Sequence, residues 1–289
     1  MKIPTKKLES GFEMPVFGIG TWGIGGRHER DPDTDIAKEV RTIQEAIGLG
    51  ITHIDTAESY ANGFSEEIVG EAIADFDRSK LFLVSKVKPE NLHRDDLKSS
   101  LQKSLARLKT DYLDLYLIHK PNPCVDIAET MQAMDEAKAE GLIKNIGVSN
   151  FTIERFEQAQ ACTKNKIVAN QLHLNLIYRE SERKGLIDYC QKNDVMFIAW
   201  RPVEKGLLTS ESNELISELC KKYSKSPAQI AINWLVSQKN IVTLSKSSNT
   251  AHLKENLEAL DFQMGQEDIE RLDKDFPHQK DISDAVPLI

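Results

Sequence analysis

The feature that most constrains the fold is an eightfold alternation of short apolar runs with longer amphipathic stretches. The units follow one another at an interval of 289/8, or about 36 residues. Near-continuous apolar runs of this length fit strands that are buried on both faces, as in a parallel sheet. We expect the eight strands at residues 16–19, 52–55, 81–84, 112–118, 143–148, 167–174, 195–200 and 241–244.

The stretches between these runs carry helix signals. In residues 35–49 the side chains of Val40, Ile43 and Ala46 share one face, and Gly50 follows as a C-cap. Ser226-Pro227 forms an N-cap and first-turn pair that begins another helix. The predicted helices cover residues 35–49, 65 onward, 94–108, 127–139, 152–161, 182–192, 213–223, 227–238 and 250–260.

Eight strand–helix units predict an α/β protein of the (β/α)8 TIM barrel type, formed by a single domain over residues 1–289. A doubly wound sheet is the alternative, because it shows the same alternation with fewer strands. Apolar residues on both sides of Glu9-Ser10-Gly11 predict an N-terminal β-hairpin, expected at the barrel bottom. The two helices of the seventh interval predict one extra helix near the seventh unit.

Composition excludes several classes of protein. With 37 Lys+Arg against 45 Asp+Glu, the formal net charge is 37 − 45 = −8, which argues against nucleic acid as the main partner. No run of about eighteen apolar residues exists, so we expect no membrane span. The basic start MKIPTKKLESG lacks the apolar stretch of a signal peptide. The four cysteines show no metal-ligand spacing, so reduced thiols, no metal site and a cytoplasmic location are expected.

Polar side chains occur where the predicted strands end. Asp55 ends the second strand and Tyr60 follows it, while Lys86 and His119 end the third and fourth. In a barrel the functional residues lie beyond the C-terminal ends of the strands, so these four groups are expected at one mouth. Each has a structural explanation when taken alone, such as an ion pair for Asp55 with Lys86. Four of them at successive strand ends favour a catalytic site.

Two motifs known from dehydrogenases also occur. Gly18, Gly20 and Gly23 match GxGxxG, but that fingerprint requires the glycines to open a helix at once, and here a loop follows. Tyr116 and Lys120 match YxxxK, which works only on a helix, where positions i and i+4 share a face. The surrounding stretch reads as a strand. We therefore interpret both matches as accidental.

Taken together, the motifs resemble the aldo-keto reductase superfamily over nearly the whole chain. The resemblance is to a prokaryotic-type member with short substrate loops, and it implies a TIM barrel that catalyses NAD(P)H-dependent reduction of aldehydes and ketones. The segments that carry it are Gly18-Ile-Gly-Thr-Trp22, Thr52-His-Ile-Asp-Thr-Ala-Glu-Ser-Tyr60, Ser85-Lys86, Asp114-Leu-Tyr-Leu-Ile-His119, Ile146-Gly-Val-Ser-Asn-Phe151, Lys246-Ser247 and Glu255-Asn256.

The resemblance implies roles for the four mouth residues. Tyr60 would protonate the carbonyl oxygen as hydride reaches the carbon. A free phenol has a pKa near 10, and the ammonium of Lys86 is expected to lower the pKa of Tyr60. Asp55 would hold Lys86 in place, and His119 would donate a hydrogen bond to the same oxygen. Together they would stabilise a developing alkoxide.

The resemblance also implies a cofactor site for NADPH, with NADH as an alternative. Ser149, Asn150 and Gln171 would bind the nicotinamide amide, and Trp200 would stack on the ring. Lys246, Ser247 and Asn249 would hold the 2′-phosphate, helped by the N-terminus of the eighth helix. The complete predicted cofactor set is Gly20, Thr21, Trp22, Asp55, Ser149, Asn150, Gln171, Trp200, Arg201, Pro202, Val203, Leu207, Lys246, Ser247, Asn249, His252, Glu255 and Asn256.

Two residues depart from the family pattern. His252 stands where NADPH-preferring members commonly have Arg, a permanent bidentate charge for phosphate, so the preference for NADPH is expected to be weaker. Arg201 stands where many members have Ser. Its guanidinium would either reach the cofactor pyrophosphate or pair with an acid such as Glu204.

The substrate pocket is expected to be open, because the loops 120–125 and 204–209 are short and little follows residue 261. Its predicted lining is Trp22, Tyr60, His119 and Asn122 for a small-molecule carbonyl substrate, in a monomer or weak homo-oligomer. Two other functions remain open at this point. One is a cofactor-binding regulatory subunit on the same barrel, and the other is a lyase that forms a Schiff base on Lys86.

Overall fold

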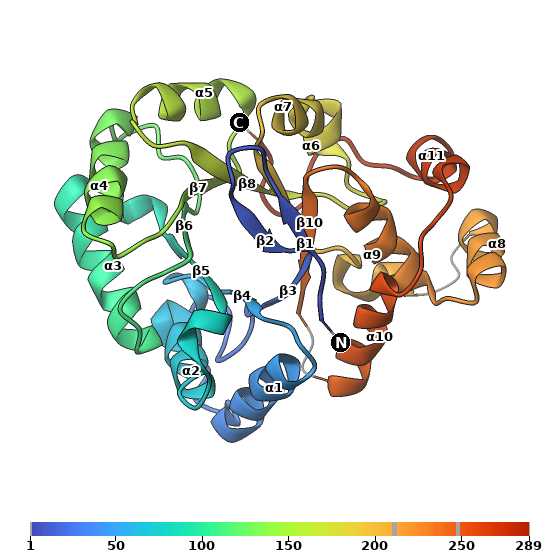
Figure 1. Ribbon diagram of the computed structural model, residues 1–289, viewed down its shortest axis with the longest axis horizontal. Helices are drawn as coiled ribbons and strands as arrows, with labels where there is room; N and C mark the ends of the chain where they lie inside the picture. The colour runs from blue at the N-terminus through green and yellow to red at the C-terminus, as the bar shows by residue number, and fades with distance from the viewer. Residues whose placement is uncertain (1, 210–212, 247–248, 289) are drawn as a thin grey trace. The chain divides into compact units, whose positions relative to one another are not determined.

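The computed structural model describes residues 2–209, 213–246 and 249–288. The eight strands β3 to β10 are parallel and close into a barrel in the order β10-β3-β4-β5-β6-β7-β8-β9, which confirms the predicted (β/α)8 fold (Figure 1). The strands are β3 (Phe17–Gly20), β4 (His53–Asp55), β5 (Phe82–Val87), β6 (Leu115–Ile118), β7 (Ile146–Ser149), β8 (Ile167–His173), β9 (Met196–Trp200) and β10 (Ile241–Ser245).

Helices follow the strands much as the apolar periodicity predicts. The expected helix over residues 182–192 is instead two helices, because Gly185 adopts a φ of 73° between them. The helices are α1 (Ile36–Gly48), α2 (Phe64–Ala72), α3 (Arg94–Leu108), α4 (Ile127–Ala139), α5 (Ile153–Ala161), α6 (Glu180–Arg183), α7 (Leu186–Lys192), α8 (Glu214–Tyr223), α9 (Pro227–Ser237), α10 (Thr250–Leu257) and α11 (Gln266–Asp275). Helices α8 and α9 both lie between β9 and β10, so the predicted extra helix is present.

The chain forms two compact units, residues 18–170 and residues 2–17 with 171–289, which we describe separately. In the first unit β3 pairs with β4, β4 with β5, β5 with β6 and β6 with β7. This pairing places Gly18 beside His53. A Cβ at Gly18 would lie 2.4 Å from Nδ1 of His53, so only glycine leaves room for this buried imidazole.

The second unit contains the N-terminal hairpin, formed by β1 (Thr5–Lys7) and β2 (Glu13–Pro15). Nζ of Lys6 donates to the carbonyl oxygens of Val236 and Ile241 at 2.7 and 2.6 Å. The hairpin turn binds the carboxylate of Asp194 through the backbone N–H groups of residues 9 and 10. These contacts lie at the N-terminal ends of β9 and β10, which is the bottom of a barrel, as predicted.

The chain after residue 261 is more extensive than expected. Helix α11 is followed by an extended segment, residues 277–288, that pairs with the loop after β8 through Arg179 N–H to Lys280 O at 2.8 Å and Lys280 N–H to Ile177 O at 2.7 Å. The prediction that little follows residue 261 is therefore wrong. Helix α11 has a strong polar excess with only Asp268, Ile269 and Leu272 buried, and so sparse an apolar face is hard to recognise in a sequence.

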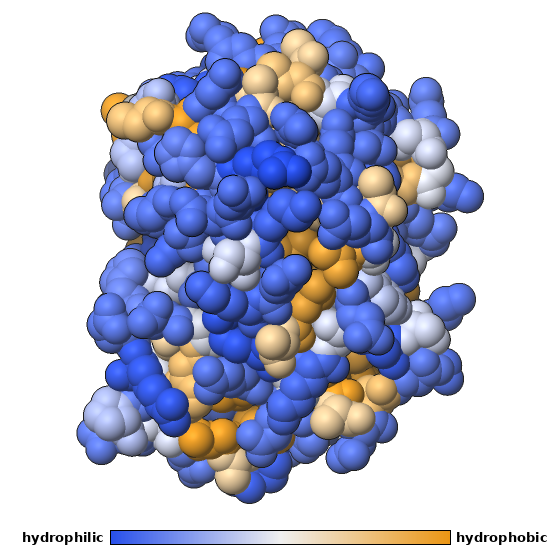
Figure 2. Space-filling model, turned by 90° about the vertical axis from the view of Figure 1, so that its left-hand side faces the viewer, coloured by the Kyte–Doolittle hydropathy of each residue, from blue (hydrophilic) through white to orange (hydrophobic). Residues whose placement is uncertain are grey.

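No helix of the described residues is long and apolar enough to cross a membrane. Figure 2 shows one face of the molecule, on which hydrophilic side chains predominate and apolar ones gather only in small groups. An ordinary surface of this kind gives no sign of a large docking patch on that face.

Candidate active site

The ammonium of Lys86 is the centre of the predicted catalytic group. Lys86 lies inside β5, and its side chain is fully buried. Its Nζ donates to Oδ1 of Asp55 at 2.6 Å, to the carbonyl oxygen of Thr56 at 2.7 Å and to Oη of Tyr60 at 3.2 Å. The three donors of the ammonium therefore all have partners, and one of them points at the phenol.

Register explains why these groups meet. Strand β4 pairs with β5 so that Asp55 is level with Val84, two residues before Lys86. Side chains two apart on a strand share a face, so Lys86 projects on the same side as Val84, one step nearer the C-terminal end. Tyr60 lies at the start of the 3-10 turn η1 (Tyr60–Gly63), which directly follows the loop after β4. The expected meeting of strand-end groups is thus a consequence of parallel pairing.

The pKa values of this group follow from burial and from the ion pair. Burial disfavours the ammonium, but Asp55 and Tyr60 outweigh it and raise the pKa of Lys86 above 10.5. Burial of the phenol raises the pKa of Tyr60, and Lys86 offsets this only in part. The predicted effect of Lys86, which lowers the pKa of Tyr60, is present, but desolvation is the larger effect and the net pKa is raised. Tyr60 therefore carries its proton at neutral pH.

His119 lies directly beyond β6 and joins the group through its ring. The ring centroids of Tyr60 and His119 are 5.6 Å apart in an edge-on arrangement. Burial, with smaller effects of Lys86 and Lys120, holds the pKa of His119 well below 6.5, so the imidazole is neutral. Its Nδ1 lies 3.1 Å from Oγ of Ser59. If Ser59 donates this hydrogen bond, the proton of the imidazole is on Nε2.

The other two residues predicted for the substrate pocket, Trp22 and Asn122, differ in exposure and in hydrogen bonding. The indole of Trp22 is 36% exposed, the largest exposure in this group, and packs edge-on against Tyr60 at 5.0 Å and His28 at 5.1 Å between centroids. Asn122 donates through Nδ2 to the carbonyl oxygen of Pro89 and accepts from the N–H of Cys124. The amide of Asn122 is thus engaged in shaping its own loop.

Three predicted nicotinamide contacts lie in or directly after strands. Ser149 ends β7, and Gln171 lies inside β8. Nδ2 of Asn150 donates to the carbonyl oxygen of His119 at 3.0 Å and to Oγ of Ser149 at 2.9 Å. Oδ1 of Asn150 is buried without a hydrogen-bond partner among the described residues. A buried acceptor of this kind costs free energy until a donor reaches it, and a carboxamide N–H is a suitable donor.

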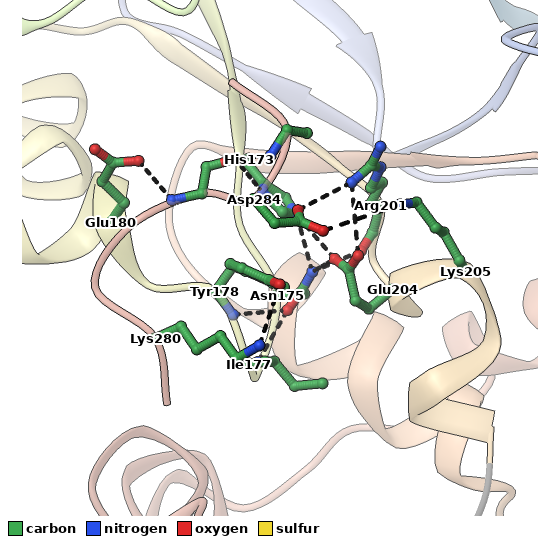
Figure 3. Close-up of polar contacts among 12 residues, drawn as sticks. His173, Asn175, Ile177, Tyr178, Glu180, Arg201, Glu204, Lys205, Lys280 and Asp284 are labelled. Atoms are coloured by element: carbon green, nitrogen blue, oxygen red, sulfur yellow. Dashed lines mark hydrogen bonds and ion pairs between the residues drawn. The ribbon is translucent and has the colours of Figure 1, made fainter. Parts of the chain in front are cut away.

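The fourth predicted nicotinamide contact is Trp200, the last residue of β9 in the second unit. Its ring stacks on His173 with centroids 4.0 Å apart and an interplanar angle of 5°. Arg201 follows with a φ of 60°, and its guanidinium lies 3.6 Å from Glu204 and 3.2 Å from Asp284. Of the two partners expected for Arg201, the acid Glu204 is therefore present, together with a second acid from the C-terminal segment (Figure 3).

The remaining predicted cofactor residues lie at the end of β3, in the turn after it and in the turn after β9. Thr21 is buried and accepts a hydrogen bond from Oγ of Ser65 at 2.9 Å, beside the buried Gly20. Pro202 and Val203 form the turn before η4 (Glu204–Thr209), whose Leu207 is 64% exposed.

The residues predicted for the adenosine end lie around α10. Asn249 is the N-cap and accepts from the N–H of Ala251. Lys246 and His252 are exposed, while Asn256 is buried and donates to Oγ of Ser245 at 3.3 Å. Glu255 is half-buried. Ser247 lies outside the described residues, so its predicted contact with phosphate remains a sequence prediction.

Sequence reasoning missed several residues of these sites. Ser59 and Thr56 precede Tyr60 and were not singled out, although both lie in the same strand-end loop. His173, whose ring stacks on Trp200, was missed as well. Ser283 and Asn175, which contact the nitrogens of that ring, were also missed, and no motif marks these three residues. The polar residues His173 and Asn175 in an otherwise apolar stretch are the one signal that was available.

Comparisons with known proteins show what the whole chain is similar to. A glyoxal reductase of Bacillus subtilis is 34% identical over 93% of this chain and 91% of its own length, and a methylglyoxal reductase of Escherichia coli is 33% identical over 92% and 93%. A thermostable aldo-keto reductase solved with the inhibitor epalrestat has 43% identity and a TM-score of 0.90, covering 94% of this chain and 99% of its own.

A second solved structure, an aldo/keto reductase from Klebsiella pneumoniae in complex with NADP and acetate, has 28% identity and a TM-score of 0.85 over 99% of this chain and all of its own. The family model described as the aldo/keto reductase family matches residues 16–275. With the barrel and the Asp55–Lys86–Tyr60 contacts, these matches lead to one conclusion. The chain belongs to the aldo/keto reductase family.

Proposed function

We propose that this protein reduces a small aldehyde or ketone to an alcohol with NADPH as the hydride donor. The observation that carries the proposal is the contact of Nζ of Lys86 with both Asp55 and Tyr60 in a buried site. The relatives that are named glyoxal and methylglyoxal reductases favour short dicarbonyl compounds as the first substrates to test. We further propose a single catalytic domain, acting in the cytoplasm as a monomer or weak homo-oligomer.

In this proposal Tyr60 is the general acid. Its raised pKa keeps the phenol protonated at neutral pH, and the ammonium of Lys86, 3.2 Å away, stabilises the phenolate that forms when the proton leaves. Asp55 fixes the ammonium, so no reorganisation is needed as charge develops. Neutral His119 donates from Nε2 to the carbonyl oxygen, which orients the substrate between the imidazole and the phenol.

The residues present fit a nicotinamide cofactor. Oδ1 of Asn150 is a buried acceptor that the cofactor carboxamide would satisfy, together with Ser149 and Gln171. NADPH, when bound, supplies the hydride. Trp200 would present its ring to the nicotinamide, and Lys246, Asn249 and His252 would hold the 2′-phosphate at the start of α10. A helix N-terminus adds backbone donors for such an anion.

The first experiment measures NADPH and NADH binding by fluorescence titration, followed by cofactor oxidation with glyoxal, methylglyoxal and longer aldehydes. We expect tighter binding of NADPH and turnover of the short dicarbonyls. A protein that binds NADPH but turns over no carbonyl would instead be a regulatory subunit. Trapping of a carbonyl compound on Lys86 by borohydride, without NADPH binding, would favour the Schiff-base lyase.

A further inference from the structure

Four buried side chains form a hydrogen-bonded group beside Trp200 that the proposed mechanism does not use. They are His173 at the end of β8, Asn175 in the following loop, Glu204 at the start of η4 and Ser283 in the C-terminal segment, and we call them the His173 cluster (Figure 3). Their exposures are 4%, 0%, 2% and 3%. Buried polar groups of this kind need complete hydrogen bonding, so the cluster can be checked atom by atom.

The proton positions follow from counting donors and acceptors. Oγ of Ser283 accepts from the N–H groups of Ala285 and Val286 at 3.2 and 3.1 Å, which uses its two lone pairs. Its own proton is therefore directed to Nδ1 of His173, 2.8 Å away. With Nδ1 as the acceptor, the ring proton is on Nε2, which donates to Oε2 of Glu204 at 2.8 Å.

Asn175 completes the arrangement. Its Oδ1 accepts from the N–H groups of Ile177 and Tyr178, both at 2.9 Å, which fixes the orientation of the amide. Its Nδ2 then donates one proton to Oε2 of Glu204 at 2.7 Å and the other to the carbonyl oxygen of Arg201 at 2.9 Å. The cluster thus ties the C-terminal segment to the residue that directly follows Trp200.

The imidazole of His173 also lies between two rings. Trp200 stacks on it at 4.0 Å between centroids, and Tyr178 stacks on it at 4.7 Å with an interplanar angle of 24°. One face of the Trp200 indole is therefore covered by His173, and the guanidinium of Arg201 lies 5.2 Å from the centroid of the indole. A nicotinamide that stacks on Trp200 would take the face opposite His173. The hydrogen bonds to Nδ1 and Nε2 hold the His173 ring in one orientation. The indole of Trp200 therefore packs against a ring that does not rotate.

We infer that His173 and Ser283 are positioning residues for the cofactor, which hold the indole of Trp200 at the angle that the nicotinamide ring requires. The inference rests on the proposed role of Trp200 in cofactor binding. The C-terminal segment then acts on the nicotinamide end of the cofactor through Ser283, His173 and Trp200 in turn, and through Asn175 on the backbone of Arg201.

Two members of the cluster, His173 and Glu204, lie close to Asp284, but these three residues do not make a metal site. Ligand atoms of His173, Glu204 and Asp284 lie within 4.8 Å of one another. The guanidinium of Arg201 already serves both carboxylates, at 3.6 and 3.2 Å, and Nε2 of His173 carries a proton that a metal ion would have to displace. The positive charge beside Glu204 and Asp284 is thus already supplied by Arg201, with Lys205 4.0 Å from Asp284.

The test uses two ligands that share the adenosine end. Dissociation constants are measured for NADPH and for adenosine 2′,5′-bisphosphate, which has no nicotinamide. His173→Gln removes the ring but keeps an amide that can donate to Glu204, and Ser283→Ala removes one hydrogen bond. We expect NADPH to bind about tenfold more weakly to His173→Gln and about threefold more weakly to Ser283→Ala, with the bisphosphate unchanged in both.

Asp281→Asn is the matched control in the same segment, because Asp281 is exposed and pairs with Arg183 at 3.3 Å, away from the cluster. It should leave both dissociation constants as in the wild type. Unchanged NADPH binding in both cluster variants, or equal weakening of both ligands, would overturn the inference. Trp200→Ala separates this from failure of the proposed function: if Trp200→Ala also leaves NADPH binding unchanged, the cofactor role of Trp200 itself is wrong.

Discussion

The Asp55–Lys86–Tyr60 group of the first unit and the His173 cluster of the second unit are both buried and polar. They differ in whether the carboxylate is in direct contact with an ammonium or with an imidazole. The first holds a full ammonium against a carboxylate with an N–O distance of 2.6 Å. In the second, Nε2 of the His173 imidazole donates to the carboxylate of Glu204, which also lies 3.6 Å from the guanidinium of Arg201. The ammonium can stabilise a charge that develops during a reaction, whereas the imidazole can only hold its neighbours in place.

The comparison predicts how the two regions respond to substitution. Removing either charged member of the first group, Lys86 or Asp55, leaves an uncompensated charge, which costs more than losing the contact itself. Removing a neutral member leaves an unsatisfied hydrogen-bonding atom, with a cost of roughly 1–3 kcal/mol. Substitutions of Lys86 or Asp55 should therefore change chemistry and stability together, and substitutions of the neutral members of the His173 cluster should mainly change cofactor binding.

Lys86→Met should have the largest effect. It leaves the carboxylate of Asp55 buried without its partner, and we expect a loss of about 3–5 kcal/mol in the free energy of unfolding together with loss of turnover. Urea unfolding and NADPH oxidation measure the two effects. The control is the double variant Lys86→Met with Asp55→Asn, which removes the buried charge and should recover stability without activity. Normal turnover in Lys86→Met would show that Lys86 does not act on Tyr60.

Tyr60→Phe should separate chemistry from stability within the same group. It removes the proton donor but no charge, so carbonyl reduction should fall by roughly 10²–10⁴-fold while NADPH binds as before. Single-turnover reduction and cofactor titration are the measurements. A variant with near-normal turnover would reject Tyr60 as the general acid.

His53, a buried imidazole near Asp55 and Lys86, should make the stability of the protein depend on pH. Burial lowers the pKa of His53 from 6.5 to about 4; the charge of Asp55 opposes this shift, and the charge of Lys86 adds to it. A lowered pKa means that the unfolded chain binds the proton first as the pH falls. The stability is complete above pH 6.5 and declines between pH 6.5 and 4, by about 3 kcal/mol at 1.36 kcal/mol for each pKa unit.

The measurement compares unfolding of the wild type and of His53→Phe at pH 7, 5 and 4. Phenylalanine keeps a flat ring against Gly18 and the ring of Phe82 but cannot bind a proton. The wild type should lose more stability than the variant over this range. Parallel pH curves for the two proteins would mean that His53 binds its proton normally in the folded state.

The same contrast explains which of the two polar groups could be predicted from the sequence. The barrel and the Asp55–Tyr60–Lys86–His119 set were predictable because strand ends in a parallel barrel converge, so local patterns carried the long-range contacts. The His173 cluster was not predictable in this way. It joins Asn175, Glu204 and Ser283 across more than 100 residues of chain, and Ser283 lies in a segment without periodicity. The direction of the Tyr60 pKa shift also required the degree of burial, which spacing alone does not provide.

His252→Arg should have the smallest effect, because it acts at an exposed site at the start of α10. An arginine there would meet the 2′-phosphate that only NADPH carries, so NADPH should bind up to about tenfold more tightly and NADH as before. A charge-assisted hydrogen bond is worth roughly 1.5–3 kcal/mol, and solvent screening reduces that figure here. The gain should shrink as salt is raised, since the Debye length is about 10 Å at 0.1 M. Dissociation constants for both cofactors at low and high salt measure it, and equal changes for NADPH and NADH would place His252 away from the phosphate.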